Sequence, residues 1–167
     1  MIVQILYLEQ LQFSKVSYYT VQVEGRPLSE FRDFQTRMQH NEKDKKQVAE
    51  INRFIENIGK KHGAQDRFFK REGFAERLPP ATYRFLDSDG ETDFGLRLYC
   101  VRISEEVVIL LNGDRKTAQS IKDCLNCKPH FDFANKISDA IYEAKTKDRI
   151  EIDGFDILMD DDFVLNI

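Results

Sequence analysis

Two neighbouring segments decide the predicted fold: GLRLYCVRI at residues 95–103 and VVILLN at residues 107–112. Apolar and polar side chains alternate along the first segment, which is the period of a half-buried β-strand over about 94–103. One face of this strand would carry Leu96, Leu98 and Cys100, and the other would carry Arg97, Tyr99 and Val101. The second segment is mostly apolar, which indicates a buried central strand. Because only three residues separate them, the two strands should pair antiparallel.

The segments before this pair contain further strands and two helices. Thr82–Leu86 has strand character, and a turn over residues 87–90 would connect it to the long strand as an antiparallel meander. Val16–Val23 also alternates as a strand, and residues 2–8 could form another. Two amphipathic helices should form a hairpin, one starting at the N-cap Ser29 and the other spanning about 44–62.

The segments after the pair add a short helix from Thr117 to Leu125 and a longer one over residues 131–145. Residues 149–167 return to a strand pattern, with a hairpin turn at Asp153-Gly154. The predicted fold class is α+β: an N-terminal helical hairpin on an antiparallel meander sheet, a C-terminal helix and an added acidic β-hairpin. We predict a single domain over 1–147 and an acidic appendage over 148–167.

Composition excludes several classes of protein. With 167 residues, 41% hydrophobic and 32% charged, the chain suits one folded domain and is too apolar for a disordered one. It has no apolar run of the ~18 residues that a membrane helix needs, and no secretory signal at its N-terminus, so a cytoplasmic location is expected. The net charge is −4, but seven acidic residues stand against the single base Arg149 in 148–167. The remaining body is mildly basic.

The sequence lacks GxSxG, Walker A, GxGxxG and HExxH motifs, so common hydrolase and nucleotide-binding classes find no support. Cys124, Cys127 and His130 lie within seven residues and could bind a metal, with Cys100 as a fourth ligand. Zinc ribbons usually have two CxxC pairs, and Cys100 falls on a core face, so we expect no metal and no cofactor. A redox pair is also disfavoured, because the motif does not open the helix of a βαβ unit.

Basic residues form a second constellation. If the sheet curves around one face, cations from several segments could meet beside Tyr99 and hold phosphates while the ring stacks a base. The cations concerned are Lys70, Arg71, Arg77, Arg84, Arg97, Arg115 and Lys116. The alternative is a solvated sheet face, on which arginines alternate with leucines without any ligand.

Residues 95–103 and 107–117 resemble the C-terminal half of the RelE/ParE superfamily of bacterial toxins, in which an arginine-bearing strand precedes an aliphatic strand and a basic pair. The helical hairpin is also similar. The resemblance implies a toxin whose ribonuclease members cut messenger RNA on the ribosome without metal. By this resemblance, Arg97 would stabilise the phosphate in the transition state. Arg115 and Lys116 would be the basic pair that follows the last core strand. Lys116, Tyr99 and His130 are the candidate acids and bases.

The same resemblance implies two partners, the ribosome with its messenger RNA and a neutralising antitoxin, itself a DNA-binding protein. Three alternatives stay open: a ParE-like module that binds a topoisomerase without cutting RNA, an inactive homologue, and a CxxC-stabilised interaction domain. For the acidic tail, residues 153–162 could fold back over the basic face and compete with RNA, or the hairpin could only cover a sheet edge.

Overall fold

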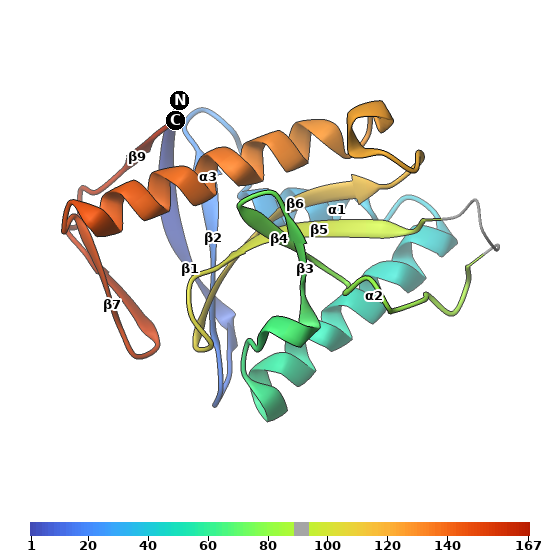
Figure 1. The fold of residues 1–167 in the computed structure, drawn as a ribbon, viewed down its shortest axis with the longest axis horizontal. Helices are drawn as coiled ribbons and strands as arrows, with labels where there is room; N and C mark the ends of the chain where they lie inside the picture. Colours follow the sequence, from blue (N-terminus) through green and yellow to red (C-terminus); the bar gives the residue numbers. More distant parts are fainter. Residues whose placement is uncertain (89–93) are drawn as a thin grey trace.

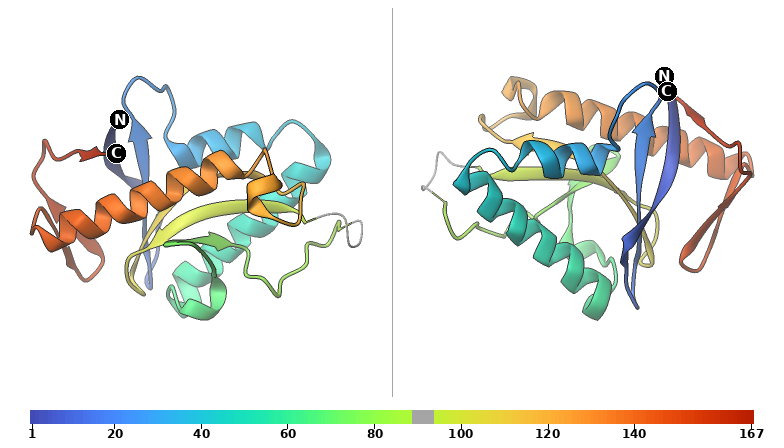
Figure 2. Two further views of the ribbon diagram at one scale, coloured as in Figure 1. Left: turned by 45° about the horizontal axis from the view of Figure 1, so that its top comes forward. Right: turned by 180° about the vertical axis from the view of Figure 1, so that it is seen from behind.

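The computed structural model describes residues 1–88 and 94–167, which form a three-layer α+β structure. A seven-stranded sheet is the middle layer (Figure 1). Helices α1 (Glu30–Arg37) and α2 (Glu42–Asn57) cover one face, and α3 (Lys128–Thr146) crosses the other, as the view from behind in Figure 2 makes clear. In these described ranges, every helix is too short or too polar to span a membrane.

The sheet has the order β3-β4-β5-β6-β2-β1-β9 and is mostly antiparallel. Its strands are β1 (Ile2–Gln12), β2 (Ser17–Val23), β3 (Lys70–Glu72), β4 (Ala75–Leu78), β5 (Leu96–Arg102), β6 (Val107–Arg115) and β9 (Leu165–Asn166). An antiparallel meander runs from β3 to β6, but β4 takes the place beside β5 that the sequence analysis gave to residues 82–86. Both N-terminal strand segments are real strands. The sheet is not wholly antiparallel, however, because β2 and β6 pair in parallel at its centre.

The alternation predicted for β5 holds and separates two hydrophobic cores. Leu98 and Cys100 are fully buried on the α1 and α2 side, whereas Tyr99 and Val101 belong to the core beneath α3. Both helical predictions in the N-terminal half are confirmed. The hydroxyl of Ser29 caps α1, and α2 continues through a π-helical turn (Ile58–His62) that ends at Gly63, with a φ of 80°.

Two local predictions are wrong. Residues 82–86 form no strand, because Tyr83 packs on α2, where its hydroxyl donates to Glu50 and its ring lies 4.7 Å from that of Phe54. The turn expected over 87–90 falls partly outside the described residues. The helix expected from Thr117 is reduced to one 3₁₀ turn (Ile121–Asp123), since the Thr117 N–H donates to the sulfur of Cys124 instead of starting a helix.

The acidic tail lies at the opposite sheet edge from β3 and β4 (Figure 1). Its strands β7 (Ile150–Asp153) and β8 (Asp156–Met159) form the expected hairpin, and β9 pairs with the start of β1. Ile150, Ile157 and Leu165 are buried in the core beneath α3, so the tail contributes to that core. This placement overturns the idea that residues 153–162 cover the basic face. The tail instead covers the edge of the sheet at Ile2 and Val3 of β1, which pair with β9.

Candidate functional site

A row of side chains crosses three strands on the α3 side of the sheet. Lys70 pairs with Arg77, and Arg77 pairs with Tyr99, so all three lie on one face, because directly opposed residues share a face. Arg97 precedes Tyr99 by two residues and lies on the same face. Lys116 reaches this region from the end of β6, where its N–H donates to the Gly95 carbonyl at 3.0 Å. We call Lys70, Arg77, Arg97 and Lys116 the basic cluster.

The cations of the basic cluster affect one another electrostatically. Burial, followed by the charge of Arg77, lowers the pKa of Arg97 to about 10. Burial also lowers the pKa of Lys116, and the charges of Arg97, Arg77 and Lys70 add to this effect, while Glu72 opposes it. Four cations that repel one another around one carboxylate are arranged to attract an anion.

Backbone packing fixes the position of Arg97. One guanidinium nitrogen donates to the Leu96 carbonyl at 3.1 Å, but Nε is buried without a partner among the described atoms. Gly113 of β6 pairs with the next residue, Leu98, and a Cβ on Gly113 would stand 1.7 Å from the Arg97 carbonyl oxygen. Only glycine therefore lets the two strands approach this closely, next to the register irregularity between Leu98 and Cys100.

Arg77 has a structural role within the cluster. It is 5% exposed, pairs through Nε with Glu72 at 3.0 Å and donates to the Pro79 carbonyl. Lys70 also contacts Glu72, at 3.5 Å, but is itself exposed. Arg77 therefore holds Glu72 in place. Lys70 is exposed, and Arg97 and Lys116 are half-buried, with the Lys116 Nζ 5.3 Å from the centroid of the Phe94 ring, so a ligand would meet these three cations.

Tyr99 lies beneath the basic cluster, not on its surface. Its side chain is fully buried, with the ring edge-to-face against Phe131 at 6.1 Å between centroids. Burial raises the pKa of its hydroxyl, with further contributions from Cys127 and Glu72. Because the Tyr99 ring is covered, no base can stack on it, and its role is to pack in the core next to Arg97.

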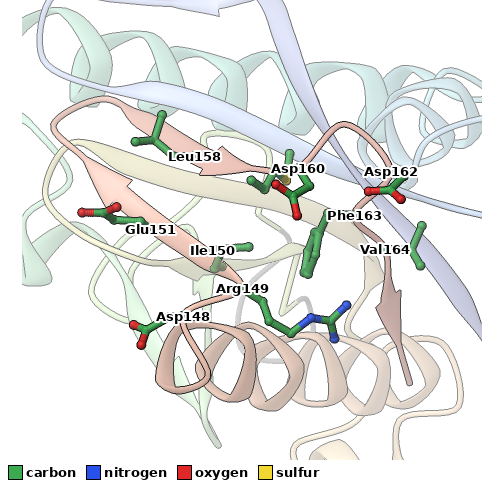
Figure 3. Close-up of a pocket in the computed structure, with 10 residues that line it drawn as sticks. Asp148, Arg149, Ile150, Glu151, Leu158, Asp160, Asp162, Phe163 and Val164 are labelled. Carbon is green, nitrogen blue, oxygen red and sulfur yellow. The ribbon is translucent and has the colours of Figure 1, made fainter.

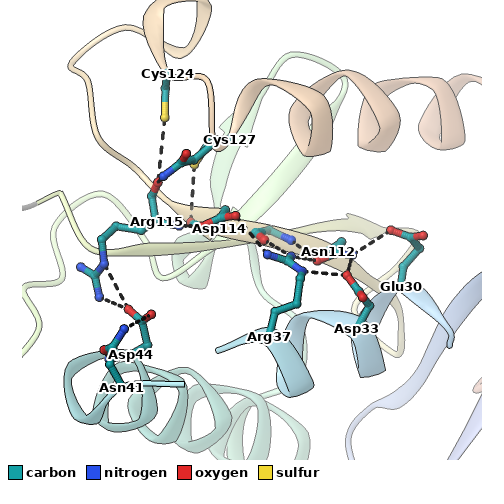
Figure 4. Close-up of polar contacts among 12 residues, drawn as sticks. Glu30, Asp33, Arg37, Asn41, Asp44, Asn112, Asp114, Arg115, Cys124 and Cys127 are labelled. Atoms are coloured by element: carbon teal, nitrogen blue, oxygen red, sulfur yellow. Dashed lines mark hydrogen bonds and ion pairs between the residues drawn. The ribbon is translucent and has the colours of Figure 1, made fainter. Parts of the chain in front are cut away.

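Arg115 does not join the basic cluster. Its guanidinium binds Asp44 near the start of α2, on the opposite face of the sheet (Figure 4). Arg71 also points to the opposite face from its neighbour Lys70. Arg84 is exposed and follows Tyr83, which packs on α2. Of the seven cations predicted for the constellation, the structure thus brings four together.

A polar network between α1 and the end of β6 was not anticipated from the sequence (Figure 4). Asn112 is 3% exposed and donates to Glu30 at 3.0 Å and to Asp33 at 2.8 Å. Arg37 binds Asp33 at 2.8 Å and Asp114 at 3.0 Å. Burial raises the pKa of Glu30, although the bond from Asn112 acts in the other direction. The network anchors α1 beside β6.

His130 faces this network and not the cysteines. Burial lowers its pKa most, followed by the charge of Arg37, while Asp114 and Asp33 oppose the shift. Cys100 is buried in the other core, across the sheet from Cys124 and Cys127. Within residues 1–88 and 94–167, no three histidine, cysteine or acidic side chains are placed to share a metal ion.

Two cavities lie away from the basic cluster. One of about 580 Å³ lies in the tail and is lined by residues that include Arg149, Asp160, Asp162 and Phe163 (Figure 3). In it, the Arg149 guanidinium lies 4.9 Å from the Phe163 ring centroid, so the cation is already occupied. A larger cavity of about 940 Å³ runs between β1 and the two N-terminal helices.

The chain matches no protein-family model, no curated protein and no solved structure. Its function must therefore be inferred from the geometry of the basic cluster.

Proposed function

We propose that the chain is a RelE/ParE-like toxin that binds the phosphates of messenger RNA at the basic cluster and cuts the backbone without a metal. The observation that carries this proposal is the meeting of Arg97 of β5 and Lys116, the residue after β6, on one face with Lys70. Phosphate contacts position an RNA, and Arg and Lys are the side chains that make them.

The chemistry follows from the two central cations. In metal-free cleavage the ribose 2′-oxygen loses its proton, attacks phosphorus and displaces the 5′-oxygen, which must take up a proton. Arg97 is half-buried, where its charge interacts more strongly with an anion than it would in water, so we assign it to the charge that develops on the phosphorane. Lys116 has a lowered pKa, which makes it the better proton donor for the 5′-oxygen than the covered Tyr99 or the distant His130.

The architecture is compatible with this family. Two helices pack on one face of a sheet whose strand β5 carries Arg97 and whose strand β6 is aliphatic. The proposal includes the partners that the family implies: the ribosome, a neutralising antitoxin encoded nearby, and a cytoplasmic site of action.

Inducible expression followed by mapping of messenger RNA 5′ ends tests the proposal. The wild-type protein should create new ends inside translated frames. Arg97→Ala should reduce their number by ~100-fold, the effect of losing one preorganised donor. The matched control is Lys61→Ala, which removes one exposed cation from the π-helical turn on the far side of the sheet.

The alternative is a protein-binding module directed at a topoisomerase. Growth arrest with intact transcripts and damaged DNA would favour it and contradict the nuclease. Equal cleavage by a folded Arg97→Ala protein would remove the basic cluster from the site.

A further inference from the structure

Cys124 and Cys127 form the turn that starts α3. The Lys128 N–H donates to the Cys124 carbonyl at 3.0 Å, and the Phe131 N–H donates to that of Cys127 at 2.9 Å. The first bond closes a helix-type turn over Cys124–Lys128, in which the two cysteines are three residues apart and therefore neighbours on one side of the turn. A disulfide spans ~4.4–6.8 Å between Cα atoms. The CxxC motif does open a helix of 19 residues, α3, although α3 is not the helix of a βαβ unit, because the chain continues from it into β7 of a separate two-stranded sheet.

The two sulfurs lie side by side at the end of β6 (Figure 4). The thiol of Cys127 donates to the Asp114 carbonyl at 3.5 Å, and that of Cys124 lies 4.0 Å from the adjacent Arg115 carbonyl. The Thr117 N–H donates to the Cys124 sulfur at 3.4 Å. The N–H and the thiol of Cys127 also face the Cys124 sulfur.

These contacts give the two thiols different chemistry. Burial raises the pKa of Cys124, but hydrogen bonds from Thr117 and Cys127 outweigh it and lower the value to about 7. Burial, together with the neighbouring Cys124, raises the pKa of Cys127 to about 12. At neutral pH one thiolate thus lies beside one thiol, which is the arrangement of an attacking and a resolving cysteine.

We propose that Cys124 and Cys127 are a reversible thiol-oxidation site that takes a peroxide as its oxidant. The Cys124 thiolate attacks one peroxide oxygen and becomes a sulfenic acid, and the O–O bond breaks to release hydroxide. The Cys127 sulfur then attacks the Cys124 sulfur, the S–O bond breaks, and its proton leaves with the second hydroxide as water. In total, two thiols and one hydrogen peroxide give one disulfide and two waters.

The position of the pair limits access to small oxidants. Both cysteines are fully buried, yet Leu125 between them is 84% exposed, and the only regular structure in residues 117–126 is one 3₁₀ turn. Local opening of this loop admits a molecule as small as hydrogen peroxide. The site is independent of RNA cleavage, since it requires only the turn at the start of α3.

Mass spectrometry of the reduced, full-length protein treated with hydrogen peroxide tests the proposal. Cleavage by trypsin leaves both cysteines in the peptide Asp123–Lys136, because Lys128 precedes a proline. This peptide should become lighter by about 2 Da, lose both alkylation sites and recover them after dithiothreitol. Cys100, which is buried in the other core, should stay reduced. Two alkylatable thiols after treatment, or irreversible oxidation of either one, would overturn the proposal.

Single variants test the order of the two steps. Cys127→Ser should stop the reaction at the sulfenic acid of Cys124, seen as a peptide heavier by about 16 Da that reacts with dimedone. Cys124→Ser should leave Cys127 reduced, and Cys100→Ser should react as the wild-type protein does. A sulfenic acid on Cys127 in the Cys124→Ser protein would contradict the assigned roles.

Discussion

Arg115 donates from Nε to Asp44 at 3.1 Å, and this ion pair fixes its side chain on the α2 side of the sheet. The next residue, Lys116, lies instead beside Arg97 on the α3 side. Two adjacent cations that look like one basic pair in the sequence therefore have different roles. Arg115 stabilises the fold, and Lys116 belongs to the basic cluster.

Arg115→Ala should lower the free energy of unfolding by about 1–3 kcal/mol, because Asp44 keeps a half-buried carboxylate without this donor. RNA cleavage per folded molecule should stay unchanged. Urea unfolding and a cleavage assay at a temperature where both proteins are folded measure the two quantities. A large loss of cleavage by folded Arg115→Ala would return this residue to the site.

Arg97→Met should abolish RNA binding without weakening the fold. Arg97 is held partly buried, and its Nε has no partner among the described residues, so the charge opposes folding. An apolar side chain of similar length is often neutral or stabilising at such a position, by up to ~4 kcal/mol. Thermal unfolding and filter binding check both effects. A strongly destabilised variant would show that the guanidinium has a structural role.

Glu30→Gln should stabilise the protein increasingly as the pH rises above the ordinary pKa of a glutamate, about 4. The pKa of Glu30 is raised in the folded state, so its ionisation there reduces stability as the pH passes from the unfolded to the folded value. Glutamine keeps an acceptor for Asn112 and cannot ionise. Melting temperatures of both proteins at a series of pH values measure the difference, with exposed Glu24→Gln as the control for net charge. A constant difference would contradict the burial effect.

Replacing Asp160, Asp161 and Asp162 together by asparagine should leave RNA affinity within about twofold at ~0.15 M salt. All three are exposed, and the tail occupies the sheet edge opposite to β3 and β4. Charges separated by more than the ~8 Å Debye length are largely screened. Electrophoretic mobility shifts with one RNA oligonucleotide measure the affinity. A many-fold increase would show that the tail does compete with RNA.

Local sequence patterns predicted the elements whose structure depends on their own side chains. The alternation in 95–103 predicted β5, and the apolar run in 107–112 predicted most of β6. Both strands form because their own side chains are buried on the two faces of the sheet. Residues 82–86 have an equally good pattern but form no strand, because Glu50 of α2 binds the Tyr83 hydroxyl and the Leu86 N–H. The parallel pairing of β2 with β6 depends on residues far apart in the chain, so no local sequence pattern predicts it.

The candidate site was predicted in part for the same reason. The strand period correctly placed Arg97 and Tyr99 on one face, but it could not show that α3 covers the Tyr99 ring. The direction of Arg115 depends on Asp44, which lies 71 residues away. The network around Asn112 had one sequence signal, a polar residue directly after five apolar ones in a central strand.

The cleavage rate of a messenger RNA on purified ribosomes tests the central claim, the action of the basic cluster, most directly. Primer extension would compare the wild-type protein with Lys116→Ala and the control Lys61→Ala, after circular dichroism shows that all three are folded. The proposed role predicts cleavage by the wild-type and Lys61→Ala proteins at equal rates, and a rate at least ~100-fold lower for Lys116→Ala. Equal cleavage by all three, or none by the wild-type protein, would contradict it.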